Sequence, residues 1–327
     1  MTSMIRVVKP VLKILRAAAL LALPGCASVL DLDNALAIAP YKIEDGGRII
    51  VEARLNGHGP YDFVLDTGAS ISAVFNNVRD QLALEPVPGK SVIVHGAIAS
   101  GKHPLLRIEQ LQLGSAVWSD PRVVSLPGET EAGANVDGVL GVDFLRRYAI
   151  GFSVRDRVVR LYSPDVIADR SYRGWASVPL KAEAVGDSGA AFYFFDIEIE
   201  GWKIAAVFDL GAGFNMINWA GVESLGRTAR ALRMKVLLSG ALESSHVLAR
   251  IRAEEVTTAG IRWRNEEFSV GDIKIFETFK LNDKPAAILG AGLFTQRDFV
   301  IDFARNRLLV RVAMNEVNVP GNSGLSP

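Results

Sequence analysis

The chain carries one acidic turn motif twice, and this duplication limits the folds that it can adopt. Residues 61–75 read Tyr-Asp-Phe-Val-Leu-Asp-Thr-Gly-Ala-Ser-Ile-Ser-Ala-Val-Phe, and residues 204–217 read Ile-Ala-Ala-Val-Phe-Asp-Leu-Gly-Ala-Gly-Phe-Asn-Met-Ile. In each copy an apolar, strand-like run ends at an aspartate, Asp66 or Asp209, and a glycine two residues later permits a tight turn. For one copy alone, an aspartate that caps its own turn is an equally good explanation. An ionised carboxylate at the end of a buried strand is energetically costly, so its presence in both copies favours a functional role for the two aspartates.

Further matches follow the two aspartates along the chain. The aspartates are 143 residues apart, and this offset drifts by only a few residues elsewhere. Gly-Val-Leu-Gly at 138–141 corresponds to Ala-Ile-Leu-Gly at 287–290, and a basic turn at 155–159 corresponds to 305–309. Small drifts of this kind are typical of loop insertions between copies. The sequence therefore predicts two duplicated lobes.

Short strand-like runs separated by Gly, Pro, Asn and Asp fill the rest of the chain, a pattern that indicates an all-β fold. Each lobe also has a tip of small residues that suits a mobile, substrate-binding flap, namely Gly96, Ala97 and Ile98 in the first and Gly240, Ala241 and Leu242 in the second. We expect the first lobe over 37–163, a linker over 164–176, the second lobe over 177–313 and a flexible tail over 314–327.

The N-terminal segment has the pattern of an export signal. Basic residues precede an apolar run at 17–23, and Leu-Pro-Gly-Cys ends at Cys26. The segment resembles a bacterial lipoprotein signal, which implies a signal peptide over 1–25, a lipidated Cys26, and a tether over 26–36. The protein is then expected on the periplasmic side of a bacterial membrane, the outer membrane by preference. The alternative is an ordinary signal peptide cut nearby, which leaves an exported free thiol.

Composition excludes several other classes of function. Lys plus Arg and Asp plus Glu both number 36, so the chain has no basic excess for binding nucleic acid. A single cysteine cannot form a disulfide within one chain. The four histidines lack metal-ligand spacing, so we expect no metal and no other cofactor. Trp118 and Trp263 occupy matching places in the two copies, which indicates core packing.

The first copy can be assigned to a family by resemblance. Phe-Val-Leu-Asp-Thr-Gly-Ala-Ser at 63–70, followed about seventy residues later by the Gly-Val-Leu-Gly run at 138–141, resembles the signature pair of retropepsin-like aspartic peptidases. The duplication over 37–313 is similar to the pepsin-like arrangement, in which two lobes of one chain supply one aspartate each. The resemblance implies an all-β fold of two homologous β-barrel lobes, related by a pseudo-twofold axis, with a cleft between them.

The resemblance also implies a chemistry. Asp66 and Asp209 would form a catalytic dyad that shares a proton and activates water to hydrolyse the peptide bonds of an extended polypeptide. The active-site loops would be Thr67, Gly68, Ala69 and Ser70 in the first lobe and Leu210, Gly211, Ala212 and Gly213 in the second. Because one chain holds both aspartates, we expect the active unit to be a monomer.

Leu210 and Gly213 depart from the family pattern. In the family, the Thr or Ser after each Asp interlocks the two loops by hydrogen bonds, but Leu210 has no hydroxyl, and Gly213 stands where the first lobe has Ser70. We expect Thr67 to bond to the backbone of its own lobe instead, while Leu210 packs beneath the apolar run before Gly141 or Gly290. The protein is then an aspartic endopeptidase of reduced activity. The alternative is a catalytically silent, peptide-binding lipoprotein.

Overall fold

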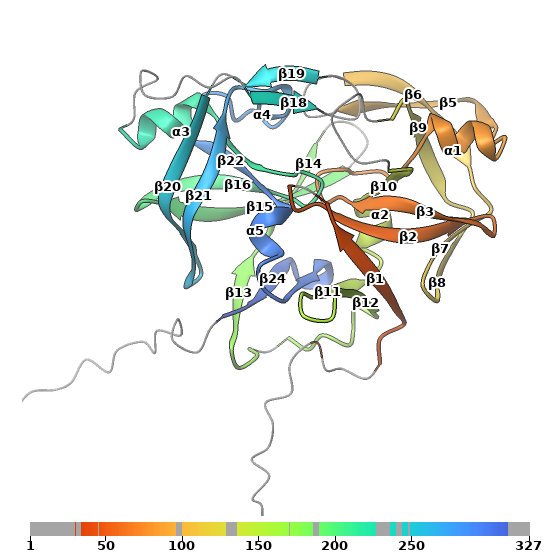
Figure 1. The fold of residues 1–327 in the computed structure, drawn as a ribbon, viewed down its shortest axis with the longest axis horizontal. Coiled ribbons are helices and arrows are strands. Elements are labelled where there is room, and N and C mark those ends of the chain that lie inside the picture. Colours follow the sequence, from red (N-terminus) through yellow and green to blue (C-terminus); the bar gives the residue numbers. More distant parts are fainter. Residues whose placement is uncertain are drawn as a thin grey trace, which may run out of the picture.

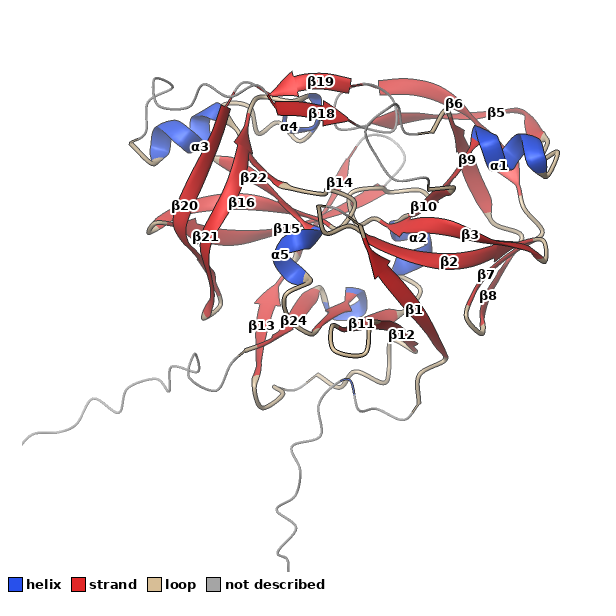
Figure 2. Cartoon of the chain, viewed as in Figure 1, coloured by secondary structure: helices blue, strands red, loops and turns tan. Residues whose placement is uncertain are grey.

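The computed structural model describes residues 30, 34–44, 46–95, 100–128, 136–169, 171–185, 190–226, 236–239, 244–247 and 249–312. Strands dominate these residues, and the helices are short (Figure 2). The helices are α1 (Asn76–Gln81), α2 (Val142–Leu145), α3 (Trp219–Ser224), α4 (Lys274–Thr278) and α5 (Ala291–Phe294), with a 3-10 turn, η3, at Phe303–Arg305. Among the described residues no helix is long and apolar enough to cross a membrane. The predicted all-β fold is confirmed.

A sheet shared by both lobes joins them at the lower side of the molecule as drawn in Figure 1. Its strand order is β13 (Trp175–Pro179), β24 (Arg307–Arg311), β23 (Phe299–Asp302), β11 (Ala149–Ser153), β12 (Val158–Tyr162) and β1 (Ala37–Ile43). The lobes meet where β11 pairs with β23 in antiparallel register. Each lobe thus contributes three neighbouring strands to one layer.

The register of this junction confirms the pseudo-twofold axis. Ala149 pairs with Asp302, and Phe152 pairs with Phe299. In the repeat, 149 corresponds to 299 and 152 corresponds to 302, so exchanging the lobes converts one pair into the other. The axis therefore passes between β11 and β23. The rings of Phe152 and Phe299 stack across it with centroids 4.2 Å apart.

The second lobe is a closed six-stranded barrel. Its strands run in the order β15 (Ala190–Ile199), β16 (Trp202–Asp209), β22 (Ala286–Gly290), β17 (Asn215–Ile217), β21 (Ile261–Val270) and β20 (Ala249–Thr258), and β20 pairs back to β15. The strand β14 (Lys181–Val185) extends β15 at its edge. Closure leaves few open strand edges among these residues.

The first lobe follows the same plan with interrupted strands. Its order is β2 (Ile49–Leu55), β3 (His58–Leu65), β10 (Gly138–Leu140), β4 (Ala73–Phe75), β9 (Arg122–Leu126), β6 (Ser100–Arg107) and β5 (Pro86–His95), while β7 (Gln110–Leu113) pairs with β2 and with β8 (Ala116–Ser119). Asp120 has a left-handed backbone (φ 50°), and Pro121 lacks an N–H. These two residues divide the counterpart of β21 into β8 and β9.

The core of each lobe contains the expected tryptophan. Trp118 packs on Phe144 with ring centroids 5.9 Å apart, and Trp263 packs on Phe294 at 6.1 Å. Phe144 lies on α2 and Phe294 on α5, the helices that follow the corresponding Gly141 and Gly290. The prediction that both tryptophans serve in packing is confirmed, although Trp118 stays partly exposed.

Both predicted flap hairpins have their strands in the structure. β5 and β6 pair up to His95 and Ser100, and β18 (Val236–Ser239) pairs with β19 (Ser244–Val247) up to Ser239 and Ser244. In Figure 1 both hairpins lie at the top, on the side opposite the shared sheet. The predicted tip residues lie outside the described residues, namely Gly96, Ala97, Ile98, Gly240, Ala241 and Leu242.

Leu30, within the stretch predicted as a tether, is buried against the shared sheet. Its side chain packs among residues of both lobes, including Tyr162 and Val300. Its carbonyl oxygen accepts a hydrogen bond from Tyr162 Oη (3.2 Å). A Cβ on Gly151 would lie 2.5 Å from Leu30 Cδ2, so glycine at 151 leaves the space that Leu30 occupies. Cys26 lies outside the described residues.

Candidate active site

Each aspartate stands at the end of a buried strand beside a parallel neighbour. Asp66 follows β3, which pairs with β10, and its N–H donates to Leu140 O (3.0 Å). Asp209 ends β16, where it lies opposite Gly290 of β22. In each lobe a parallel hydrogen-bond ladder fixes the aspartate strand beside its neighbour, so the two carboxyl groups project from the equivalent end of their barrels. The apolar-apolar-Gly runs found in the sequence are the neighbours that hold them.

The loops after the two strands bring the carboxyl groups together. Asp66 and Asp209 hydrogen-bond to each other through their side chains. A Cβ added to Gly68 would lie 2.5 Å from Cγ of Asp209, and one added to Gly211 would overlap Cγ of Asp66. The contact is reciprocal, as a twofold arrangement requires. Each loop glycine is needed because any side chain there would displace the opposite carboxylate.

Backbone donors and burial set the protonation of this pair. Gly68 N donates to Asp66 Oδ1 (2.7 Å), and Gly211 N donates to Asp209 Oδ1 (2.9 Å). Burial raises the pKa of Asp66 well above its usual range, and the negative charge of Asp209 raises it further. Burial also raises the pKa of Asp209, against the opposing effect of its hydrogen-bond donors. Two carboxylates so close cannot both ionise easily, so the pair retains one proton as a unit.

Thr67 links the two loops, contrary to the prediction that it would bond to its own lobe. Its hydroxyl donates to Phe208 O (2.8 Å) and accepts from Leu210 N (2.9 Å), and the side chain is fully buried. The prediction was wrong because it considered only the side chain at 210. The backbone amide of Leu210 is available whatever that side chain is, and a hydroxyl can donate and accept at once.

Comparisons with known proteins decide the family. The sequence profile of the family described as "Aspartyl protease" matches residues 51–144 and 195–293, more than half of the chain. The chain belongs to the aspartyl protease family. Among solved structures, it is similar to basic 7S globulin from soybean, with 10% identity, 85% of this chain and 95% of that chain covered, and a TM-score of 0.46. No curated protein matches the sequence.

The two matched stretches of this aspartyl protease family member contain one aspartate loop each. The duplication predicted from the sequence is therefore a duplication of the family's own unit. Both stretches also include the strand that runs beside the aspartate strand, β10 in the first lobe and β22 in the second. The family resemblance seen in the first copy thus extends to the second.

Leu210 lies in the hydrophobic core. Its side chain has no exposed surface, and it belongs to the same buried cluster as Leu140 and Leu289. The prediction that Leu210 is buried is confirmed. As a result, the Thr67 hydroxyl links the two loops of this family member on one side of the pseudo-twofold axis. On the other side the apolar side chain of Leu210 stands in place of a second hydroxyl.

We expect Leu210→Thr to change the free energy of unfolding by about 1 kcal/mol or less. A second hydroxyl could add a cross-lobe hydrogen bond worth about 0.5–1.5 kcal/mol, but the substitution removes buried apolar volume of similar value. Urea denaturation of both proteins measures the difference. A gain of several kcal/mol would show that the loops are poorly held in the wild type.

Polar residues beneath the loops complete the support and were missed in the sequence. Ser72 Oγ accepts from Gly141 N (3.0 Å) and donates to Asp143 Oδ1 (2.6 Å). In the second lobe Asn215 Oδ1 accepts from Gly290 N (3.0 Å). Ser72 and Asn215 are 143 residues apart, so a polar residue at the same place in two apolar runs was the available signal.

The remaining loop residues form the walls around the pair. Ala69 O accepts from Val142 N (2.8 Å), and Ala212 O accepts from Ala291 N (3.0 Å), so each loop is tied to the helix that follows its neighbouring strand. Ser70 and Gly213 come next and stay partly exposed. The structure thus brings together all the loop residues expected from the sequence, while the expected flap tips lie outside the described residues.

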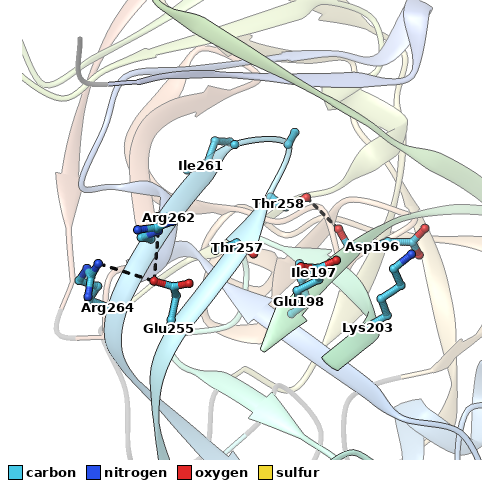
Figure 3. Close-up of a pocket in the computed structure, with 12 residues that line it drawn as sticks. Asp196, Ile197, Glu198, Lys203, Glu255, Thr257, Thr258, Ile261, Arg262 and Arg264 are labelled. Carbon is cyan, nitrogen blue, oxygen red and sulfur yellow. Dashed lines mark hydrogen bonds and ion pairs between the residues drawn. The ribbon is translucent and has the colours of Figure 1, made fainter. Parts of the chain in front are cut away.

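The described part of the chain also contains a hollow away from the aspartates, on the outer face of the second barrel (Figure 3). Its volume is about 730 Å³, and strands β15, β16, β20 and β21 line it. Arg262 and Arg264 both pair with Glu255 at its wall. The described residues contain no group of His, Cys, Asp or Glu side chains suited to a metal ion.

The half-buried carboxyl groups should make the fold less stable as pH rises. Burial raises the folded-state pKa of Asp66, Asp209 and Asp143 above the ordinary value near 3.8. A raised pKa stabilises the folded state below the ordinary value, and this contribution is lost as pH increases through the folded pKa. We therefore expect Asp209→Asn to raise Tm at pH 7 while leaving it unchanged near pH 4. Calorimetry of both proteins across this range measures it, and equal Tm values at pH 7 would contradict it.

Proposed function

We propose that the protein is an aspartic endopeptidase that hydrolyses extended polypeptide. The observation that carries this is the reciprocal pairing of Asp66 and Asp209, in which each carboxyl group lies against the glycine of the other loop. A protein that only binds peptide gains nothing from burying two adjacent carboxyl groups. Because one chain supplies both, the proposed active unit is a monomer.

The proposed reaction uses the shared proton. The ionised carboxylate takes a proton from a water molecule as the water oxygen attacks the peptide carbonyl carbon, while the protonated carboxyl group donates its proton to the carbonyl oxygen. The tetrahedral intermediate then collapses: one of its hydroxyl groups returns a proton to the ionised carboxylate, the amide nitrogen takes the proton held by the other carboxyl group, and the C–N bond breaks, so the dyad again holds one proton. Both carboxyl groups belong to one titrating unit, so neither aspartate receives a fixed role as acid or base.

A catalytically silent peptide-binding protein is the second candidate, and Leu210 is the observation that favours it. With a leucine there, the loops have one hydroxyl bridge where the family pattern has two. Against this candidate, Thr67 bonds to both a donor and an acceptor of the second loop. That bridge keeps Asp209 in place despite Leu210.

A cleavage assay separates the two candidates. Soluble protein lacking the signal segment is incubated with a denatured protein and with a peptide library, across acidic to neutral pH. Wild type, Asp66→Asn and Asp209→Asn are compared side by side. Cleavage by the wild type alone supports the peptidase. Binding of peptides by all three, with cleavage by none, supports the silent candidate.

We also propose that a lipid on Cys26 anchors the protein to a membrane on the periplasmic side, with the outer membrane as the first choice. The support is the Leu-Pro-Gly-Cys run after an apolar segment, together with the burial of Leu30. Cys26 and Leu30 are four positions apart in the chain, a span of at most about 14 Å. An anchor at Cys26 would then hold the shared sheet near the membrane and direct the aspartates, on the far side of that sheet, away from it.

Cys26→Ser tests the anchor. Several acyl chains each contribute about 0.8 kcal/mol per buried CH₂, so the lipidated protein stays with membranes, whereas a serine variant cannot be acylated. We expect the variant to accumulate as unprocessed or soluble protein. Membrane fractionation and the mass of the N-terminal peptide measure this. A variant that fractionates and migrates like the wild type would rule out lipidation.

A further inference from the structure

A turn of the first lobe lies against the active-site loop of the second lobe. It joins β1 to β2 and contains Gly46 and Gly47, whose φ angles are +103° and +96°. A Cβ on Gly46 would lie 2.8 Å from the carbonyl oxygen of Gly213, and a Cβ on Gly47 would lie 2.6 Å from the amide nitrogen of Gly292. Both neighbours are backbone atoms, which cannot rotate aside. Glycine is therefore required at both positions by the contact as well as by the φ angles.

The described residues of this turn are bonded to one another. Glu44 N donates to Arg48 O (3.0 Å), and Gly47 N donates to Glu44 O (2.8 Å). The side chains of Glu44 and Arg48 form an ion pair (2.5 Å) and are only 12% and 14% exposed. A turn held by these bonds can limit the movement of the second-lobe loop that it contacts.

Each second-lobe residue that the turn contacts directly follows a residue of the hydrogen-bond network around Asp209. Gly213 follows Ala212, whose N–H donates to Asp209 Oδ1 (3.2 Å). Gly292 follows Ala291, whose N–H donates to Ala212 O (3.0 Å). The turn therefore lies against both segments that hold Ala212.

The same contact explains why the second lobe departs from the first at one position. Gly292 corresponds to Asp143 in the repeat. A Cβ at 292 would already lie 3.2 Å from Gly46 O, so an aspartate there would be forced into the turn. Gly213 is different, because a Cβ there would meet its nearest atoms, in Arg48 and Gly46, at an ordinary 3.7 Å.

We propose that Gly46 and Gly47 are positioning residues for Asp209. Through backbone contact they hold the second loop so that the N–H of Ala212 stays aimed at the Asp209 carboxylate. The proposal makes the first lobe responsible for the geometry of the second aspartate. This proposal rests on the proposed peptidase function only where the test below measures kcat and KM.

The test compares Gly47→Ala with Gly57→Ala. Gly57 is also a first-lobe turn glycine with positive φ (+81°), but a Cβ there would meet nothing within 4 Å. Backbone strain is thus similar in both variants, and only Gly47→Ala pushes on the second lobe. We expect Gly47→Ala to lower kcat by about 10- to 100-fold with KM within twofold, since small misplacements of reacting groups have effects of this size. Gly57→Ala should keep the wild-type values.

A second readout follows the carboxyl groups directly. Carbon-13 NMR of aspartate-labelled protein, assigned with Asp209→Asn, reports the titration of the dyad without any need for activity. Moving the Ala212 donor away should raise the pH at which the pair first ionises, and should move the acidic limb of the pH–rate profile in the same direction. Asp66 is the titratable group that directly faces Asp209, so its signal is followed in parallel.

Each outcome bears on the proposal. A titration shifted in Gly47→Ala and unshifted in Gly57→Ala supports it. Equal effects in both variants, or a lower Tm with an unchanged titration, would overturn it. If Gly47→Ala does not fold, Gly292→Ala needs a shift of only a few tenths of an ångström and should show a smaller change in the same direction. If the wild type cleaves nothing, the proposed function fails, and the NMR titration alone decides this inference.

Discussion

Asp66→Asn and Asp209→Asn are each expected to lower kcat/KM by about 10²- to 10⁴-fold, the range that a positioned acid or base contributes. An amide can still fill the site and accept the N–H of Gly68 or Gly211, so the fold should survive. It cannot ionise, however, and the pair would lose its shared proton. Because the two residues act as one unit, the double variant should be little worse than either single variant.

Asp196→Asn is the matched control for these variants. Asp196 lies on β15 in the second lobe, and its side chain is 65% exposed in an ion pair with Lys181. Removing this surface charge should leave kcat/KM within about twofold, since exposed ion pairs contribute little. Equal activity in Asp66→Asn and the wild type, with purified protein free of contaminating peptidase, would remove the dyad from the mechanism.

Thr67→Val is expected to destabilise the protein by about 2–4 kcal/mol and to reduce activity strongly. The substitution keeps the shape of the side chain but removes the hydroxyl that bonds to Phe208 O and Leu210 N. Both backbone groups would then be buried without a partner, and each such group costs about 1–3 kcal/mol. Since these groups flank Asp209, the position of the second carboxylate would loosen as well.

Thr67→Ser provides the control, because it removes a methyl group and keeps the hydroxyl. We expect it to cost about 1 kcal/mol and to retain most of the activity. Urea denaturation and kcat/KM are measured for all three proteins. If Thr67→Val is no less stable than Thr67→Ser, the hydroxyl bridge contributes nothing and packing around Leu210 holds the loops alone.

The sequence by itself determined the duplicated all-β architecture and the two aspartates. Both follow from local chemistry: an apolar run must be buried, an Asp followed two residues later by Gly makes a tight turn, and a repeated pattern repeats its structure. The burial of Leu210 could also be predicted, because leucine is apolar in any surroundings. These features need no knowledge of how the lobes face each other.

Only the tertiary structure decided the contacts between the lobes. Thr67 reaches the backbone at 208 and 210, and Gly47 meets the backbone at 292, where every residue type offers the same amide groups. The pattern of side chains along the sequence does not indicate which backbone atoms of a distant segment lie opposite a given residue. The partner of Thr67 was therefore predicted wrongly, and the need for glycine at 46 and 47 became visible only when the shared sheet had placed one lobe against the other.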